Sequence, residues 1–269
     1  MVNELEQILN EPLISVIIPT FERPNETLKA VNSVISQTYR NFEIIVVDDG
    51  SSQKSFDQLK NNLSNLEVQL LRIVRSNQPG IVRNAGAERA TGEWLAFLDS
   101  DDQWHRDKLA MQIEVVKTGN VKAVASIGLI GNKRSSGEIM NSKAPKIVNQ
   151  LQLLRCNWII TSSVLIERNL YEQVGGMGES YSVRGAEDYS TWLKVSSHVD
   201  WHVIHQPLVL YSDQSPDSIR KSDPQEQNYA MSLGWIDYLN WRNTSRKNNS
   251  ILLRVALKLA PFVIWASSR

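Results

Sequence analysis

The chain has 269 residues, of which 42% are hydrophobic and 22% charged, an ordinary composition for a soluble globular protein with one large domain. Lysine and arginine together number 29, as do aspartate and glutamate, so the sequence has no overall basic field and nucleic acid is disfavoured as its main partner. The single cysteine, Cys156, excludes an intramolecular disulfide and a cysteine-based zinc site. The acidic, polar start predicts no secretory signal, and hence a cytoplasmic protein.

Strand and helix patterns alternate through the first part of the chain. Short apolar, β-branched runs predict buried strands, and apolar residues at helical spacing predict helices between them. The expected strands are Leu13–Pro19, Phe42–Val47, Val68–Val74 and Trp94–Leu98, and the expected helices are Asn25–Thr38, Lys54–Leu63 and Ile81–Ala90. This alternation implies βαβ units and a largely parallel sheet, in which right-handed crossovers bring the strand ends to one edge.

The second part of the chain is less regular. Its expected elements are a helix at Lys108–Lys117, a strand at Val121–Ile130, a loop or hairpin from Gly131 to Pro145, a strand at Ile159–Ile166, a helix at Glu167–Val174 ended by Gly175 and Gly176, a helix at Glu187–Ser196, strands near Trp201–Ile204 and Leu208–Tyr211, and a helix around Gln225–Leu239. Because there is no internal repeat and no low-complexity linker, one α/β domain is the economical prediction.

Two clusters of aspartates follow apolar runs. Phe42–Asp49 reads FEIIVVDD, and Glu93–Asp102 reads EWLAFLDSDD. Open α/β sheets bind their ligands outside the carboxyl ends of the strands, so these clusters and Thr20 are expected to converge there. Carboxylates concentrated at such an edge suit a divalent cation and, through it, a phosphorylated ligand. The sequence therefore predicts an active site at this edge of the sheet.

Four motifs in the same order resemble those of family 2 glycosyltransferases, which have a GT-A fold. They are VIIPTFERPNETLKAVNSVISQTYRNFEIIVVDDGSS from Val16 to Ser52, SNQPGIVRNAGAERATGEWLAFLDSDDQW from Ser76 to Trp104, TSSVLIERNLYEQVGGMGES from Thr161 to Ser180, and GAEDYSTWLKV from Gly185 to Val195. The resemblance implies a Rossmann-like, mostly parallel or mixed sheet flanked by helices, in a single domain over residues 1–245. Residues 1–104 would form its nucleotide-binding half and residues 105–245 its acceptor-side half.

The resemblance assigns the second acidic cluster to a nucleotide-diphosphate sugar and its cation. Asp99-Ser100-Asp101 stands where the family keeps its DxD motif. Asp101 is therefore expected to bind Mn²⁺ or Mg²⁺, and Asp99 and Ser100 to contact the nucleotide sugar. An acidic turn without a ligand is the plain alternative. Asp102 is expected to cap the helix that follows.

Other residues near the same strand ends are assigned to the nucleotide by the resemblance. Asp48 and Asp49 would accept N–H groups of the base, against the alternative of an Asx turn that ends the strand. Thr20 and Glu22 match the family's nucleotide-edge loop, although Glu22 replaces the usual asparagine. Arg83 would contact the base or the diphosphate. The alternative for Arg83 is a surface arginine paired with a glutamate of its own helix.

Glu187-Asp188 matches the family's ED motif. An inverting transfer is a single displacement that needs one general base within reach of the acceptor hydroxyl. By the resemblance, Asp188 is that base, and Glu187 belongs with the residues that bind the nucleotide sugar. The start of a helix suits an ionised carboxylate, so the plain alternative is that Asp188 serves only as a helix cap.

The end of the chain differs in character from the rest. Ile251–Ala266 reads ILLRVALKLAPFVIWA, which is too short to span a hydrocarbon core of about 30 Å. Arg254 and Lys258 share one helical face with aliphatic residues around the remainder, which predicts an amphipathic helix lying in a membrane surface. The alternative is a helix packed on the domain or on the second subunit of a homodimer. We assign residues 246–269 to this tail.

The leading hypothesis from the sequence is an inverting glycosyltransferase that moves a sugar from a nucleotide-diphosphate sugar, with UDP favoured, to a saccharide or lipid-linked saccharide. Polysaccharide or glycolipid biosynthesis at the inner face of the cell membrane is the usual setting of short family members. Many relatives carry a histidine after a strand like Leu208–Tyr211, where this chain has Gln214 and only Asp213 or Asp217 as replacements. A catalytically degenerate relative that binds nucleotide or a partner therefore stays open. A sugar-phosphate nucleotidylyltransferase is less favoured, because the loop after the first strand is not glycine-rich.

Overall fold

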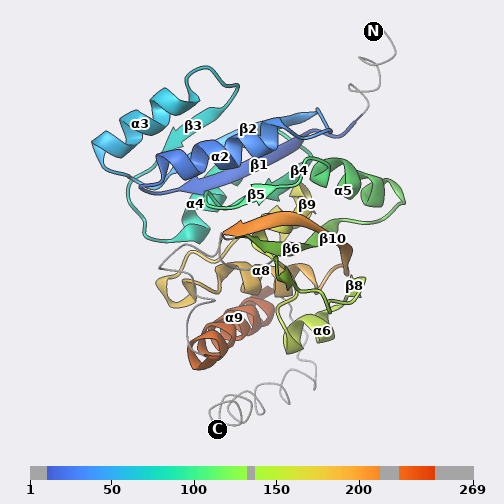
Figure 1. Cartoon of the computed structure of the whole chain (residues 1–269). Helices are drawn as coiled ribbons and strands as arrows, with labels where there is room; N and C mark the ends of the chain where they lie inside the picture. The colour runs from blue at the N-terminus through green and yellow to red at the C-terminus, as the bar shows by residue number, and fades with distance from the viewer. Residues whose placement is uncertain (1–10, 132–136, 213–223, 246–269) are drawn as a thin grey trace.

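The computed structural model describes residues 11–131, 137–212 and 224–245. The described strands form one sheet in the order β3-β2-β1-β4-β9-β6-β10-β5, with β7 paired to β6 and β8 paired to β10. Helices cover both faces of this sheet (Figure 1). The predicted α/β class with a mostly parallel, mixed sheet is confirmed.

The first half has the predicted alternation of strands and helices. Its elements are β1 (Ile14–Thr20), α2 (Pro24–Ile35), β2 (Phe42–Asp48), α3 (Gln53–Leu63), β3 (Gln69–Arg72), α4 (Pro79–Arg89) and β4 (Trp94–Phe97). β1 pairs in parallel with β2 and with β4, and β2 pairs in parallel with β3. In this register Thr20 lies beside Asp48, so the first two strands end together at one edge.

Alternate residues of the central strands face two separate hydrophobic cores. Ile17 and Ile45 belong to the core shared with α4 and with the second half of the chain. Val16 and Val46, their neighbours in sequence, belong to the core under α2 and α3. Because successive side chains of a strand point to opposite faces, a strand covered on both faces must be apolar throughout. This explains why the strand runs read as unbroken hydrophobic stretches.

The second half adds antiparallel strands and most of the remaining helices. Its elements are β5 (Gln103–Trp104), α5 (Lys108–Lys117), β6 (Ala123–Gly131), β7 (Ile139–Met140), β8 (Ile147–Val148), α6 (Gln150–Arg155), η1 (Thr161–Ser163), β9 (Leu165–Glu167), α7 (Arg168–Gln173), η2 (Tyr181–Val183), α8 (Glu187–Val195), β10 (Trp201–Ser212) and α9 (Pro224–Ser245). β9 is antiparallel to both β4 and β6 and joins the parallel part of the sheet to the parallel β6–β10 pair. α8 packs against α9 below the sheet (Figure 1).

Three of the predicted strands have different bounds in the structure. The predicted strand at Ile159–Ile166 is wrong over most of its length, because Thr161–Ser163 form a 3₁₀ turn and pairing begins only at Leu165. The two strands predicted near Trp201 and Leu208 are one strand, β10, with register shifts on either side of Pro207. Proline has no N–H group to donate to the ladder, so the pattern is interrupted there although the strand continues.

Several smaller predictions can also be compared with the structure. The hairpin reading of Gly131–Pro145 is confirmed in part, since β7 pairs antiparallel with β6. α7 ends before Gly175 and Gly176, whose φ angles are 85° and 67°, as the glycines predicted. The strands β5 and β8 and the helix α6 were not predicted. The tail at 251–266 and the positions Asp213, Gln214 and Asp217 lie outside the described residues. Within the described ranges, no helix has the length and apolar character needed to cross a membrane.

Candidate active site

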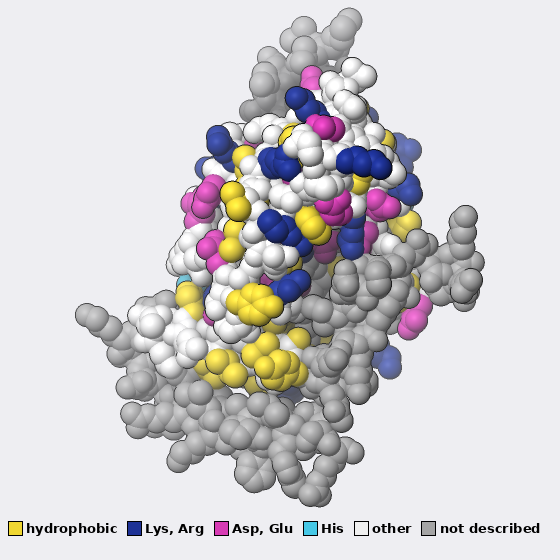
Figure 2. Space-filling view, turned by 90° about the vertical axis from the view of Figure 1, so that its left-hand side faces the viewer, with side chains coloured by type: hydrophobic (Ala, Val, Ile, Leu, Met, Phe, Trp, Pro, Cys, Tyr) yellow, Lys and Arg dark blue, Asp and Glu magenta, His cyan; other side chains and the backbone are white. Residues whose placement is uncertain are grey.

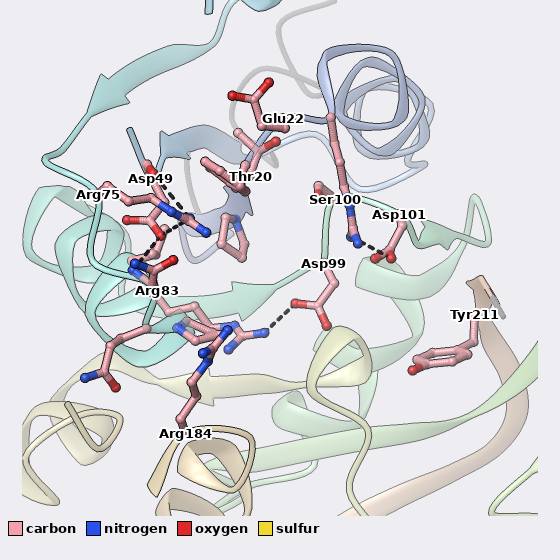
Figure 3. Close-up of a pocket in the computed structure, with 17 residues that line it drawn as sticks. Thr20, Glu22, Asp49, Arg75, Arg83, Asp99, Ser100, Asp101, Arg184 and Tyr211 are labelled. Atoms are coloured by element: carbon pink, nitrogen blue, oxygen red, sulfur yellow. Dashed lines mark hydrogen bonds and ion pairs between the residues drawn. The ribbon is translucent and has the colours of Figure 1, made fainter. Parts of the chain in front are cut away.

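A cavity of about 570 Å³ opens where β1, β2 and β4 end (Figure 3). We call it the first cavity. Because these strands are parallel, the segments that follow them meet at one edge of the sheet. The charged residues that line the first cavity are Glu22, Arg23, Asp49, Arg75, Arg83, Asp99, Asp101 and Arg184. Most of them therefore come from loops that follow strand ends, as the sequence predicted.

Asp99 and Asp101 both face the first cavity from the turn after β4. The carboxylate of Asp99 accepts a hydrogen bond from Nη2 of Arg83 at 2.5 Å, and that of Asp101 accepts one from Nη1 of Arg23 at 2.7 Å. Burial and the negative charge of Asp99 raise the pKa of Asp101 above its usual value, although Arg23 opposes the shift. Ser100 lines the same cavity. The turn thus presents two crowded carboxylates to one space.

Asp102, by contrast, points into the protein. It is 1% exposed, and its carboxylate accepts hydrogen bonds from Oγ of Ser162 at 2.5 Å and from the backbone N–H of Ser212 at 2.8 Å. Burial and the charge of Asp99 raise the pKa of Asp102 well above its usual value. The predicted helix cap is wrong, because the residue at the N-cap of α5 is Asp107. Asp102 instead ties the acidic turn to η1 and β10.

The structure separates the two aspartates at the end of β2. Asp49 lines the first cavity, and its carboxylate accepts hydrogen bonds from Arg75 at 2.5 Å and from the backbone N–H of Ser76 at 2.7 Å. Asp48 is fully buried and lines neither this cavity nor the second one described below. Its carboxylate accepts from the backbone N–H of Ser51 at 3.1 Å. Asp48 is the last residue of β2 and is buried in the sheet, whereas Asp49 begins the loop that lines the cavity.

Thr20 and Glu22 both line the first cavity, as predicted. The hydroxyl of Thr20 shares a hydrogen bond of 2.7 Å with that of Thr27. Glu22 has a positive φ of 53°, and its carboxylate accepts hydrogen bonds from the backbone N–H and, at 3.0 Å, from the hydroxyl of Ser52. The hydrogen bond from the backbone N–H of Ser52 lowers the pKa of the Glu22 carboxyl. Glu22 therefore joins the loop after β1 to the loop after β2.

Arg83, on α4, connects the acidic turn to the start of α8. Its guanidinium is 2.5 Å from Asp99 and 3.1 Å from Glu187, and the residue is 6% exposed. The alternative of a surface arginine paired within its own helix is wrong, because both partners lie on other elements. Burial, followed by the charge of Asp188, raises the pKa of Glu187. Glu187 is itself buried, although it also lines the second cavity described below.

A second cavity of about 630 Å³ adjoins the first. Both cavities are lined by Arg83 and Asp99, together with Pro79 and Tyr211. Asp188 lines the second cavity from the start of α8. Its Oδ2 accepts a hydrogen bond from the hydroxyl of Thr161 at 2.6 Å. Its Oδ1 accepts one from the backbone N–H of the next residue at 2.6 Å.

The carboxylates of the acidic turn have the chemistry that a hard divalent cation requires. Such cations take oxygen ligands, and the repulsion between Asp99 and Asp101 would be relieved by a positive charge between them. Among the described residues, no group of three histidine, cysteine, aspartate or glutamate side chains could hold a metal ion. A cation at Asp101 would therefore also need oxygen atoms from its ligand or from water.

Several lining residues were missed by the sequence analysis, namely Arg23, Arg75, Thr161, Arg184 and Tyr211. Arg23 and Arg75 lie just after strands that end at the active edge. The same rule that selected the aspartates could have found them. The other three come from η1, from the segment after η2 and from β10, and no local pattern predicts that these segments meet the first half.

Known proteins resemble this chain in sequence and in fold. The sequence model described as "Glycosyl transferase family 2" matches residues 15–173. The chain belongs to glycosyl transferase family 2. An uncharacterized glycosyltransferase of Rickettsia bellii is 28% identical over 202 residues, which are 72% of this chain but 28% of that protein. The chain thus matches less than a third of that relative's length.

For other similar proteins, the matched segment is a large share of both chains. The UDP-Glc:alpha-D-GlcNAc-diphosphoundecaprenol beta-1,3-glucosyltransferase WfgD of Escherichia coli is 30% identical over 189 residues, 70% of this chain and 71% of that protein. S. aureus TarS 1-349 in complex with UDP-GlcNAc has a TM-score of 0.67 at 18% identity, over 92% of this chain and 77% of that one. The mannosyltransferase PcManGT from Pyrobaculum calidifontis, in complex with GDP-Man and Mn²⁺, has a TM-score of 0.62 at 16% identity, over 98% and 79%. The predicted glycosyltransferase family and its fold are confirmed.

Proposed function

We propose that this chain is an inverting glycosyltransferase that moves a sugar from a nucleotide-diphosphate sugar, with UDP favoured, to a hydroxyl acceptor. The observation that carries the proposal is the wall that the two cavities share at Asp99 and Arg83. The acidic turn faces the first cavity and Asp188 faces the second. A donor held in the first cavity would present its sugar to an acceptor in the second. Residues 1–104 then supply most of the donor site and residues 105–245 most of the acceptor site.

The first cavity has groups suited to each part of a nucleotide-diphosphate sugar. We assign the base to the end near Asp49 and Thr20, with Glu22 at its edge, and the sugar and phosphates to the end near Asp99 and Ser100. The fold shared with TarS, which has been solved with UDP-GlcNAc, supports a nucleotide-sugar ligand for this chain. Asp48, Arg83 and Glu187, which the sequence placed among the contacts, are buried. We propose that Asp48 holds the loop after β2 in place through the backbone of Ser51, and that Glu187 holds Arg83 in place.

We propose that Asp101 binds Mn²⁺ or Mg²⁺. The cation, when bound, would neutralise the negative charge that develops on the diphosphate as the glycosidic bond breaks. Two findings support it: Asp101 is crowded by Asp99, and a structure of similar fold contains Mn²⁺ with GDP-Man. Asp101 faces the cavity and remains partly exposed, so its oxygens are accessible to an entering ligand.

We propose that Asp188 accepts the proton of the acceptor hydroxyl. As that oxygen attacks the anomeric carbon, its proton passes to the Asp188 carboxylate and a new C–O bond forms. The bond from the anomeric carbon to the phosphate oxygen breaks, and the nucleoside diphosphate leaves. The hydrogen bonds from Thr161 and from the Tyr189 N–H hold the carboxylate in position. Each carboxylate oxygen keeps a further acceptor position for the incoming hydroxyl.

We propose a saccharide or lipid-linked saccharide as the acceptor, in polysaccharide or glycolipid biosynthesis. The name of WfgD, a relative aligned over most of both chains, specifies a diphosphoundecaprenol acceptor. The second cavity combines apolar side chains of Ile159 and Ile160 with polar groups such as Asn157, which suits a sugar ring and its substituents. Peripheral contact with the inner face of the membrane through residues 251–266 belongs to the same proposal.

A thermal-shift screen tests the proposed donor site. UDP, GDP, dTDP and CDP are each added with and without Mn²⁺ to the wild type and to Asp101→Ala. A ligand at about 100 times its dissociation constant adds about 2.7 kcal/mol, which raises the melting temperature by roughly 2–4 °C at this size. We expect one nucleotide, UDP first, to give a shift that needs both Mn²⁺ and Asp101. No shift with any nucleotide would contradict the proposal and favour a degenerate relative.

A further inference from the structure

Among the described residues, the arginines that line the first cavity differ in their pairing. Arg23 is 2.7 Å from Asp101, Arg75 is 2.5 Å from Asp49, and Arg83 is 2.5 Å from Asp99. Each of these guanidinium charges is thus balanced by a carboxylate of the same cavity. Arg184 also lines the cavity, but no described carboxylate pairs with it. Arg184 is therefore the member of these four arginines whose positive charge is not balanced by a described carboxylate.

The side chain of Arg184 extends from its ribbon into the first cavity, toward the Arg83–Asp99 pair (Figure 3). Arg83 and Asp99 form the wall shared with the second cavity. The guanidinium of Arg184 is therefore directed to the end of the cavity at which the sugar must leave the nucleotide. It is exposed, so an entering anion need not break an existing ion pair to reach it.

The backbone on both sides of Arg184 is anchored. Val183, before it, is 3% exposed and ends the η2 turn. After it, Gly185 has a φ of 82°, and its N–H donates to Oε2 of Glu187 at 2.6 Å. The other carboxylate oxygen of Glu187 accepts from Arg83 at 3.1 Å. Arg184 is thus carried on a short turn whose position relative to Arg83 is set by two hydrogen bonds.

We propose that Arg184 binds the phosphate that carries the sugar, the β-phosphate of the nucleotide, and stabilises it as the leaving group. The inference rests on the proposed function. A guanidinium offers parallel N–H donors that match two phosphate oxygens, and its charge is permanent at physiological pH. As the glycosidic bond breaks, negative charge accumulates on this phosphate, and a fixed positive charge beside it lowers the barrier. Among the described residues that line the two cavities there is no histidine, and Arg184 is the lining arginine that no described carboxylate pairs with.

Calorimetric titration with UDP and with UMP, both in the presence of Mn²⁺, tests this assignment. The variants are Arg184→Ala, Arg184→Lys and Arg75→Ala. We expect Arg184→Ala to weaken UDP about tenfold or more, the usual effect of losing a charge-assisted bond, and to change UMP by less than about threefold. Arg184→Lys should recover part of the lost UDP affinity, because lysine keeps the positive charge but lacks the parallel N–H donors of a guanidinium. Arg75→Ala removes a positive charge from the base end of the same cavity and should weaken UMP and UDP alike.

Two results would overturn the inference. If wild type binds UDP and Arg184→Ala binds it equally well, or loses UMP and UDP to the same extent, Arg184 does not contact the β-phosphate, while the proposed donor site stands. If wild type binds neither nucleotide, the proposed function and the inference fail together. The melting temperature of each variant, measured without ligand, separates a local loss of binding from a change in folding.

Discussion

The guanidinium of Arg23 lies 2.7 Å from the carboxylate of Asp101, and this ion pair joins the loop after β1 to the acidic turn after β4. The side chains are 33% and 20% exposed, so solvent screens the pair only in part. Arg23 thus contacts the same carboxylate that we propose as the ligand of a divalent cation. Arg23 and the cation must compete for that carboxylate.

Substitution Arg23→Ala is therefore expected to increase the affinity for Mn²⁺. A partly exposed ion pair contributes up to about 1 kcal/mol, so the dissociation constant should fall by up to about fivefold. Free Mn²⁺ can be measured by electron paramagnetic resonance at a UDP concentration that saturates each variant. Arg75→Ala is the matched control, because Arg75 lines the same cavity but pairs with Asp49. Equal changes in both variants would indicate a general effect of charge and argue against direct competition.

Asp188→Asn should abolish most of the transfer activity and keep nucleotide binding. The amide has the same shape but cannot accept the proton of the acceptor hydroxyl, and loss of a general base typically lowers kcat by about 10²–10⁴. UDP titration of the same variant should give the wild-type dissociation constant, because Asp188 faces the second cavity. Full activity in Asp188→Asn would exclude this residue as the base.

Gly80→Ala should destabilise the protein and disturb the site. A Cβ atom at Gly80 would lie 2.2 Å from the backbone oxygen of Gly178, so α4 and the segment before η2 would have to separate. Overpacking of this kind costs about 1–3 kcal/mol. Gly86→Ala, on the same helix, is the control, because its Cβ would meet the side chain of Ile17 at 2.6 Å, which can adjust more easily than a backbone. Urea unfolding should show the larger loss for Gly80→Ala; the reverse order would contradict the packing argument.

Lys108 should make the free energy of unfolding increase as the pH rises toward 10.5. The side chain is fully buried, its Nζ donates to Oε1 of Gln112 at 2.7 Å, and burial lowers its pKa well below the usual value. Between the folded-state pKa and the ordinary value of 10.5, unfolding takes up a proton, so the free energy of unfolding rises with pH through that window.

The effect is measured as the difference in unfolding free energy between wild type and Lys108→Met at neutral pH and at about pH 9. We expect the difference to move in favour of the wild type as pH rises, with a slope of at most about 1.4 kcal/mol per pH unit, the value for one proton. A difference that stays constant with pH would show that Lys108 titrates alike in the folded and unfolded chains.

Local patterns in the sequence were enough to predict the parallel half of the fold and the edge at which the site lies. A strand covered on both faces needs an unbroken apolar run, and parallel strands end at one edge, so FEIIVVDD and EWLAFLDSDD indicate both structure and site. Asp188 does not follow such a strand, so it could be selected only from its resemblance to a family motif. The apolar runs of the strands, the helical spacing of apolar residues and the aspartates at the strand ends are all local features, so they are readable from neighbouring residues alone.

Only the tertiary structure decided which side chains share a space. It placed Asp49 in the first cavity and buried Asp48, and it brought Thr161 to Asp188 and Arg184 to the wall of the first cavity. These arrangements depend on β9 running antiparallel between β4 and β6, and on the turns before α8. Such contacts join residues far apart in the chain, and their geometry follows from the packing of whole elements. No short stretch of sequence carries that information.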